Sequence, residues 1–98
     1  MKARLAFIQT WYLAHCDGEW EHSYGITIDT IDNPGWRLAV DLVDTELHGH
    51  TLDRQIVERS EHDWWHVWSD GETFSGAAGP ANLGDAIDAF RDFTEGER

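Results

Sequence analysis

Residues 16–36, with the sequence CDGEWEHSYGITIDTIDNPGW, decide the predicted fold. Within this stretch Tyr24, Ile26 and Ile28 alternate with small or polar residues, and a period of two is typical of a strand with one buried face. Gly18 ends the element that precedes the strand, because glycine adopts a positive φ without steric penalty. We therefore expect a break near Gly18 and a strand that begins near Tyr24.

A turn and a second strand follow. In the sequence Asn33-Pro34-Gly35-Trp36, proline at the second position and glycine at the third predict a type II turn that closes a hairpin. The second strand has apolar residues at alternate positions, and we expect this face to meet Ile26 and Ile28 on the inner side of the sheet. The residues of that face are Trp36, Leu38, Val40 and Leu42.

The residues before the hairpin predict an amphipathic helix over about 3–15, because neither Gly nor Pro occurs before Gly18. Its apolar face has residues spaced three and four apart: Leu5, Ile8, Trp11, Tyr12 and His15. We expect Trp11 and Tyr12 to be buried against the sheet.

Three more strands are predicted after a loop at 44–51. They cover residues 52–60, 64–68 and 73–75, and the dipeptide Asp70-Gly71 predicts a tight hairpin between the last two. In the second of these strands, period two places three aromatic rings on one face and two apolar side chains on the other. The first set is Trp64, His66 and Trp68, and the second is Trp65 and Val67. One face is therefore expected to be core, and the other to be covered or to serve as an interface.

Residues 76–80 predict a flexible connector, and Asn82 is expected to cap a last helix that Gly96 ends. The apolar stripe of this helix is Leu83, Ala86, Ile87, Phe90 and Phe93. The order of elements predicts a single α+β domain over residues 1–98: an N-terminal helix, an antiparallel meander sheet of about five strands, and a C-terminal helix packed on the sheet.

The composition is strongly acidic, with 19 acids against 7 bases and a formal charge of −12. Such a charge repels nucleic acid and anionic membranes and speeds encounter with basic partners. No apolar run is long enough for a membrane span. The single cysteine, Cys16, cannot form an internal disulfide, and the N-terminus fails as an export signal because polar residues interrupt its apolar stretch. We expect a cytoplasmic protein.

Two groups of side chains resemble metal sites. The first group consists of His15, Cys16, Glu19 and His22. Side chains of these types bind zinc, but the spacing of these four fits no zinc finger. The second group, His48 and His50, has no evident third ligand. No phosphate-binding glycine loop or nucleophile elbow is present in the sequence. We expect no catalytic residue, no metal and no cofactor, and keep a small metal-dependent hydrolase that uses Cys16, Glu19 and His22 as an alternative.

The stretch from Cys16 to Trp36 resembles the signature of the immunity protein 53 family. The resemblance extends over nearly the whole chain, with mild departures at Glu19 and Ile31, where the family pattern favours Asp and Leu. Further matches are Trp11-Tyr12, Asp41-Leu42, Thr45-Glu46-Leu47, Asp63-Trp64, Phe74-x-Gly76 and Asn82-Leu83.

The resemblance implies a non-enzymatic immunity protein of a bacterial polymorphic toxin system, which binds and neutralises a cognate toxin. A basic nuclease is one toxin that an acidic inhibitor would meet quickly. We expect a monomer or weak homodimer that contacts the toxin through Asp17, Glu19, Trp20, Glu21, Asp32 and Glu46. A partly exposed Trp20 would serve as an anchor, whereas in the alternative role Trp20, His22 and Asp32 fasten the junction of helix and sheet. A general acidic adaptor, or nucleic-acid mimic, is the other alternative function.

Overall fold

The computed structural model describes residues 2–96. Three helices and five strands occur in this range. In chain order they are α1 (Lys2–His15), α2 (Trp20–Ser23), β1 (Ile26–Ile31), β2 (Gly35–Asp41), β3 (Thr51–Ser60), β4 (Asp63–Asp70), β5 (Thr73–Ala78) and α3 (Leu83–Gly96).

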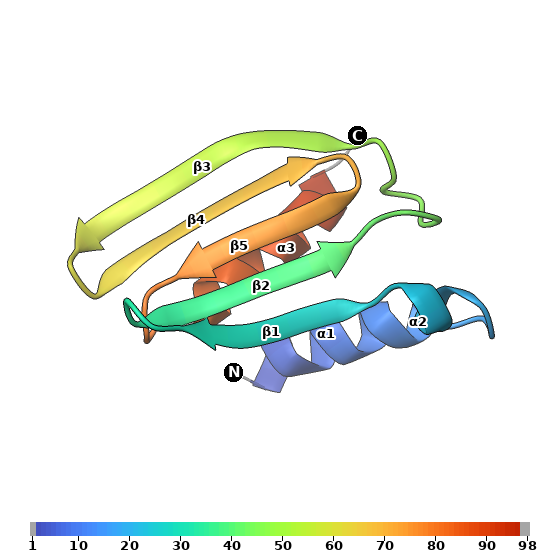
Figure 1. Ribbon diagram of the computed structural model, residues 1–98, viewed down its shortest axis with the longest axis horizontal. Coiled ribbons are helices and arrows are strands. Elements are labelled where there is room, and N and C mark those ends of the chain that lie inside the picture. The colour runs from blue at the N-terminus through green and yellow to red at the C-terminus, as the bar shows by residue number, and fades with distance from the viewer. Residues whose placement is uncertain (1, 97–98) are drawn as a thin grey trace.

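The strands form one antiparallel sheet in the order β1-β2-β5-β4-β3. α1 and α3 both lie behind this sheet in the view of Figure 1, so the predicted α+β architecture is confirmed. The sheet departs from chain order at one point, because the loop at 42–50 crosses from β2 to the far edge strand β3. The hairpin β1–β2 and the meander β3–β4–β5 are thus joined through the pairing of β2 with β5.

The core lies between the sheet and α3. Ile26 is paired with Val40 and Ile28 with Leu38, as the alternating pattern predicted. Leu38 and Val40 are fully buried with Phe90 of α3. Burying an apolar side chain of this size stabilises the fold by roughly 1.5–3 kcal/mol.

β5 extends to Ala78, so the prediction of a flexible connector over residues 76–78 is wrong. Gly76 is buried, and a Cβ there would lie 3.5–3.6 Å from side-chain atoms of Val67, Leu38 and Ala86. Small residues at 76–78 let α3 pack directly on the strand, and this tertiary packing outweighs the low strand propensity of Gly and Ala.

The predicted type II turn is also wrong. The Asn33–Pro34 peptide is cis, and Gly35 begins β2 instead of adopting the positive φ that this turn type requires. Gly35 is required for another reason, because a Cβ there would collide with the carbonyl oxygen of Ala78 on β5.

α1 packs mainly on α3 and not on the sheet. Trp11 meets Phe90 edge to face at 5.2 Å, and Arg4 forms an ion pair of 2.6 Å with Asp88. These contacts bury Ile8 and Trp11 but leave Leu5 and Tyr12 exposed, so the expected burial of Tyr12 is wrong.

The two faces of β4 separate as predicted. Val67 is buried and Trp65 packs against the core, whereas Trp64, His66 and Trp68 lie on the opposite face. Within residues 2–96 no helix or strand covers that opposite face (Figure 1).

Asn82 precedes α3, but its side chain does not cap the helix. Its Oδ1 accepts a hydrogen bond from the backbone N–H of Trp64, and its Nδ2 donates to Asp63 and Asp85. Asn82 therefore joins the start of β4 to the start of α3.

In the part of the chain that the structure describes, no helix has the length and apolar character needed to cross a membrane.

Candidate functional site

The turn between α1 and α2 is held by two of the predicted site residues. Oδ1 of Asp17 accepts hydrogen bonds from the N–H groups of Glu19 and Trp20, at 2.9 and 3.0 Å. The Glu21 carboxylate accepts from the N–H groups of Asp17 and Gly18, both at 2.9 Å. This reciprocal arrangement works like a capping box and fixes both carboxylates in place.

Backbone hydrogen bonds also set the charge of these two acids. Bonds from Trp20 and then Glu19 lower the pKa of the Asp17 carboxyl below its ordinary value. The pKa of Glu21 is lowered by its own backbone N–H first, and further by those of Asp17 and Gly18. Both groups are therefore negative at neutral pH.

Trp20 is not the partly exposed anchor that we expected, because it is only 5% exposed. Its Nε1 donates a hydrogen bond of 2.9 Å to the carbonyl oxygen of Val43, and its ring meets Trp11 edge to face at 6.0 Å. Trp20 has the alternative role considered from the sequence, since it fastens the helical segment to the loop that follows β2.

Glu46 is brought to the same end of the molecule by His15. Nε2 of His15 lies 2.9 Å from the Glu46 carboxylate, and Nδ1 lies 2.8 Å from the carbonyl oxygen of Trp11. Both partners only accept hydrogen bonds, so both bonds form together when the ring carries two protons. The hydrogen bond from His15 lowers the pKa of Glu46.

Asp44 is a further acid at this end, and we did not predict it. Its backbone has φ +65°, a left-handed conformation that Asp tolerates better than most residues, and its side chain is exposed. Within residues 2–96 no hydrogen bond or ion pair engages the carboxylate of Asp44 or that of Glu19. We call Asp17, Glu19, Glu21, Asp44 and Glu46 the acidic corner.

Part of the acidic corner surrounds a hollow of about 380 Å³. Its lining consists of Asp17, Glu19, Trp20, Ser23, Tyr24 and Asp44. Asp32 lies elsewhere, in the turn at the other end of β1, roughly 20 Å away at about 3.3 Å per strand residue. The structure thus brings together four of the predicted acids and separates Asp32 from them.

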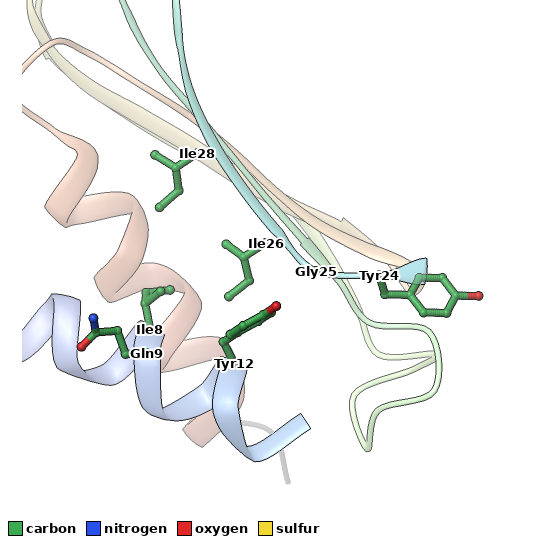
Figure 2. A pocket seen from close by; sticks show the side chains of 7 residues that line it. All are labelled: Ile8, Gln9, Tyr12, Tyr24, Gly25, Ile26 and Ile28. Carbon is green, nitrogen blue, oxygen red and sulfur yellow. The ribbon is translucent and has the colours of Figure 1, made fainter. Parts of the chain in front are cut away.

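An apolar groove of about 490 Å³ adjoins this corner, between α1 and β1. Figure 2 shows Ile8 and Tyr12 on α1 across from Ile26 and Ile28 on β1. Gln9, Tyr24 and Gly25 complete the lining, and Tyr24 also lines the acidic hollow.

The sequence contained two signals for this groove. The first is Tyr12, which follows the helical period but places a second bulky ring next to Trp11. The second is Tyr24, the residue at which the alternating strand pattern begins. The pattern predicts a buried Tyr12 and places Tyr24 on the alternating face of a half-buried strand, because periodicity alone does not show that α1 leans on α3.

The histidine and cysteine residues do not assemble as a zinc site would require. The Cys16 thiol donates to the carbonyl oxygen of Tyr12, and the side chain of His22 is exposed. Over residues 2–96, no three His, Cys, Asp or Glu side chains are grouped to hold a metal ion.

Comparison with known proteins gives one family. The model of the family described as Immunity protein 53 matches residues 5–95. No curated protein and no solved structure gives a significant match. Because the match covers nearly the whole chain, from α1 through the acidic corner to α3, this chain belongs to the immunity protein 53 family.

Proposed function

We propose that this protein neutralises the cognate toxin of a bacterial polymorphic toxin system by binding it, without catalysis, through the acidic corner. Membership of an immunity protein family supports the binding of a toxin. The observation that carries the choice of surface is the arrangement of its acids. Asp17, Glu21 and Glu46 are held by hydrogen bonds, while Glu19 and Asp44 remain exposed and unengaged beside them.

Such a surface suits a basic partner for two reasons. The formal charge of −12 attracts a basic toxin over long range and raises the rate of encounter. Carboxylates that are already oriented lose little side-chain entropy on binding, so more of the electrostatic attraction contributes to affinity. A basic nuclease is the toxin class that we favour.

The first test is co-expression with a toxin domain encoded next to this chain. The toxin should kill cells that lack the protein and be harmless in cells that contain it. A purified 1:1 complex should accompany this protection. Protection without any physical complex would contradict neutralisation by binding.

A pair of charge-reversal variants tests the surface. Glu19→Lys with Asp44→Lys should weaken toxin binding by at least about tenfold, since close charge pairs contribute strongly at such interfaces. Asp53→Lys with Glu61→Lys is the matched control, because it changes net charge equally at exposed positions on β3 and the β3–β4 turn. Equal loss in both variants would show that only the overall charge matters.

The same variants separate a specific inhibitor from a general acidic adaptor. In our proposal the protein binds one toxin far more tightly than unrelated basic proteins, and the corner variant affects only the toxin. Comparable affinity for several basic proteins would favour the adaptor.

A further inference from the structure

The apolar groove combines features that a peptide-binding site needs. Tyr12 and Ile28 on its walls are each 39% exposed, although both carry large apolar surfaces. Ile8 and Ile26 lie deeper on the same two walls, and Figure 2 shows all four side chains directed toward the space between α1 and β1. A volume of about 490 Å³ is within the usual range of ligand pockets.

The strand beside the groove has a free edge. β1 is the first strand of the sheet and is paired only with β2 among the described strands. The N–H of Asp41 donates to the carbonyl oxygen of Gly25, which makes 25 and 41 a hydrogen-bonded pair. Because such pairs alternate along antiparallel strands, the N–H and C=O groups of Ile26, Ile28 and Thr30 point away from β2.

These outward backbone groups and the groove belong to the same residues. The side chains of Ile26 and Ile28 face α1, while the backbone N–H and C=O groups of the same two residues form the free edge of β1. An added strand that pairs with these groups would direct alternate side chains into the groove. The backbone would then supply affinity, and the groove would select apolar side chains.

Charge indicates what kind of strand would bind. Tyr24 lines both the groove and the acidic hollow, so a chain that leaves the groove at this end meets Asp17, Glu19 and Asp44. A segment with apolar residues followed by Lys or Arg fits both parts. A second copy of this protein fits poorly, because each chain carries a formal charge of −12.

We propose that the free edge of β1 and the groove bind an extended segment of the toxin, whose apolar side chains enter the groove and whose basic residues reach the acidic corner. This inference depends on the proposed function and adds to it a binding mode and a location. The segment extends the sheet as a sixth strand.

Two side-chain variants with matched controls test the groove. Tyr12→Ala and Ile28→Gln should each weaken toxin binding by at least about tenfold, mainly through faster dissociation. Leu13→Ala and Ile56→Gln are the controls, since these exposed side chains, at 72% and 55%, lie on the same helix and on the opposite edge strand but outside the groove. The controls should change binding by less than about threefold. Thermal unfolding of all four variants shows that each is folded.

Hydrogen exchange of the complex gives a direct readout of strand addition. The amides of Ile26, Ile28 and Thr30 should become protected when the toxin binds, because each gains a backbone partner. If the wild type binds toxin, but the groove variants bind equally well and these amides exchange as before, the groove inference is wrong and the proposed function stands. If the wild type binds no toxin, the proposed function itself fails. A wild-type dimer that loses its association in Ile28→Gln would identify a second copy as the occupant and overturn the inference.

Discussion

Replacing Trp20 with Phe removes one hydrogen bond from the junction between α2 and the loop after β2 while keeping an aromatic ring there. Trp36→Phe is a matched control. Trp36 also donates from Nε1 to a backbone carbonyl, that of Pro80 at 3.0 Å, but this bond is exposed at the opposite end of the sheet. The two variants thus remove the same chemical group from a buried and from a hydrated position.

The expected loss follows from burial. Trp20 is 5% exposed, and the Val43 carbonyl oxygen would lose its 2.9 Å bond. A lost hydrogen bond of this kind costs about 0.5–1.5 kcal/mol, and the smaller ring leaves a partly collapsed cavity worth about 1–2 kcal/mol. We expect Trp20→Phe to lower the free energy of unfolding by about 2–3 kcal/mol, and Trp36→Phe by under about 1 kcal/mol because water replaces the lost donor.

Urea unfolding at 25 °C, followed by circular dichroism, measures both losses. For a domain of this size, about 2–3 kcal/mol corresponds to a fall in Tm of roughly 10–20 °C. Toxin affinity of folded Trp20→Phe should change by less than about threefold, because only 5% of Trp20 is exposed for a partner to contact. A stability loss equal to that of Trp36→Phe would refute the junction role, and a large loss of affinity with normal stability would restore Trp20 as an anchor.

Three further predictions concern stability. The pKa values of Asp17, Glu21 and Glu46 are lowered on folding, so the charged carboxylates stabilise the fold above the ordinary pKa values of 3.8 and 4.5, and this stabilisation is lost as the pH falls below them. The urea concentration at the unfolding midpoint should therefore decrease when the pH is lowered below about 4.5, and it should decrease less in Asp17→Asn. Gly35→Ala should destabilise the fold by about 1–3 kcal/mol in urea unfolding, because its Cβ meets the Ala78 carbonyl oxygen, whereas Gly25→Ala, with open space around it, should cost under about 1 kcal/mol. Asn82→Asp replaces two donated hydrogen bonds by contacts between carboxylates, so the Tm of the variant should lie below that of the wild type at pH 7, and this difference should shrink near pH 4. Equal Tm values for variant and wild type at pH 7 would contradict that role of Asn82.

The sequence predicted the elements whose pattern is set by burial on one face. Leu38 and Val40 alternate with small or polar residues because one side of β2 faces α3, and this alternation identified both the strand and its contacts with Ile26 and Ile28. The helix of residues 3–15 was predicted from the spacing of its apolar residues and from the absence of Gly and Pro before Gly18.

The errors occur where long-range packing decides. Gly35 in β2 is a glycine because the Ala78 carbonyl oxygen of β5 approaches it closely, and Gly76 belongs to β5 because Leu38, Val67 and Ala86 pack around it; no local pattern shows either. Tyr12 satisfies the helical period, yet its exposure depends on the position of α1 against α3.

The candidate site was predictable only in part. The acids of residues 17–21 are close in sequence, and Glu46 was included as an outlying acid. Asp44 joins them through the fold of the loop after β2, and Asp32 lies apart because β1 separates it from the turn that holds Asp17.

The association rate constant between this protein and its toxin, measured against salt concentration, tests the central claim most directly. If an oriented acidic surface attracts a basic partner, kon should fall by at least about tenfold between low and high ionic strength while koff changes little. A kon that does not depend on salt, or the absence of any complex at low ionic strength, would contradict electrostatic recognition of the toxin by the acidic corner.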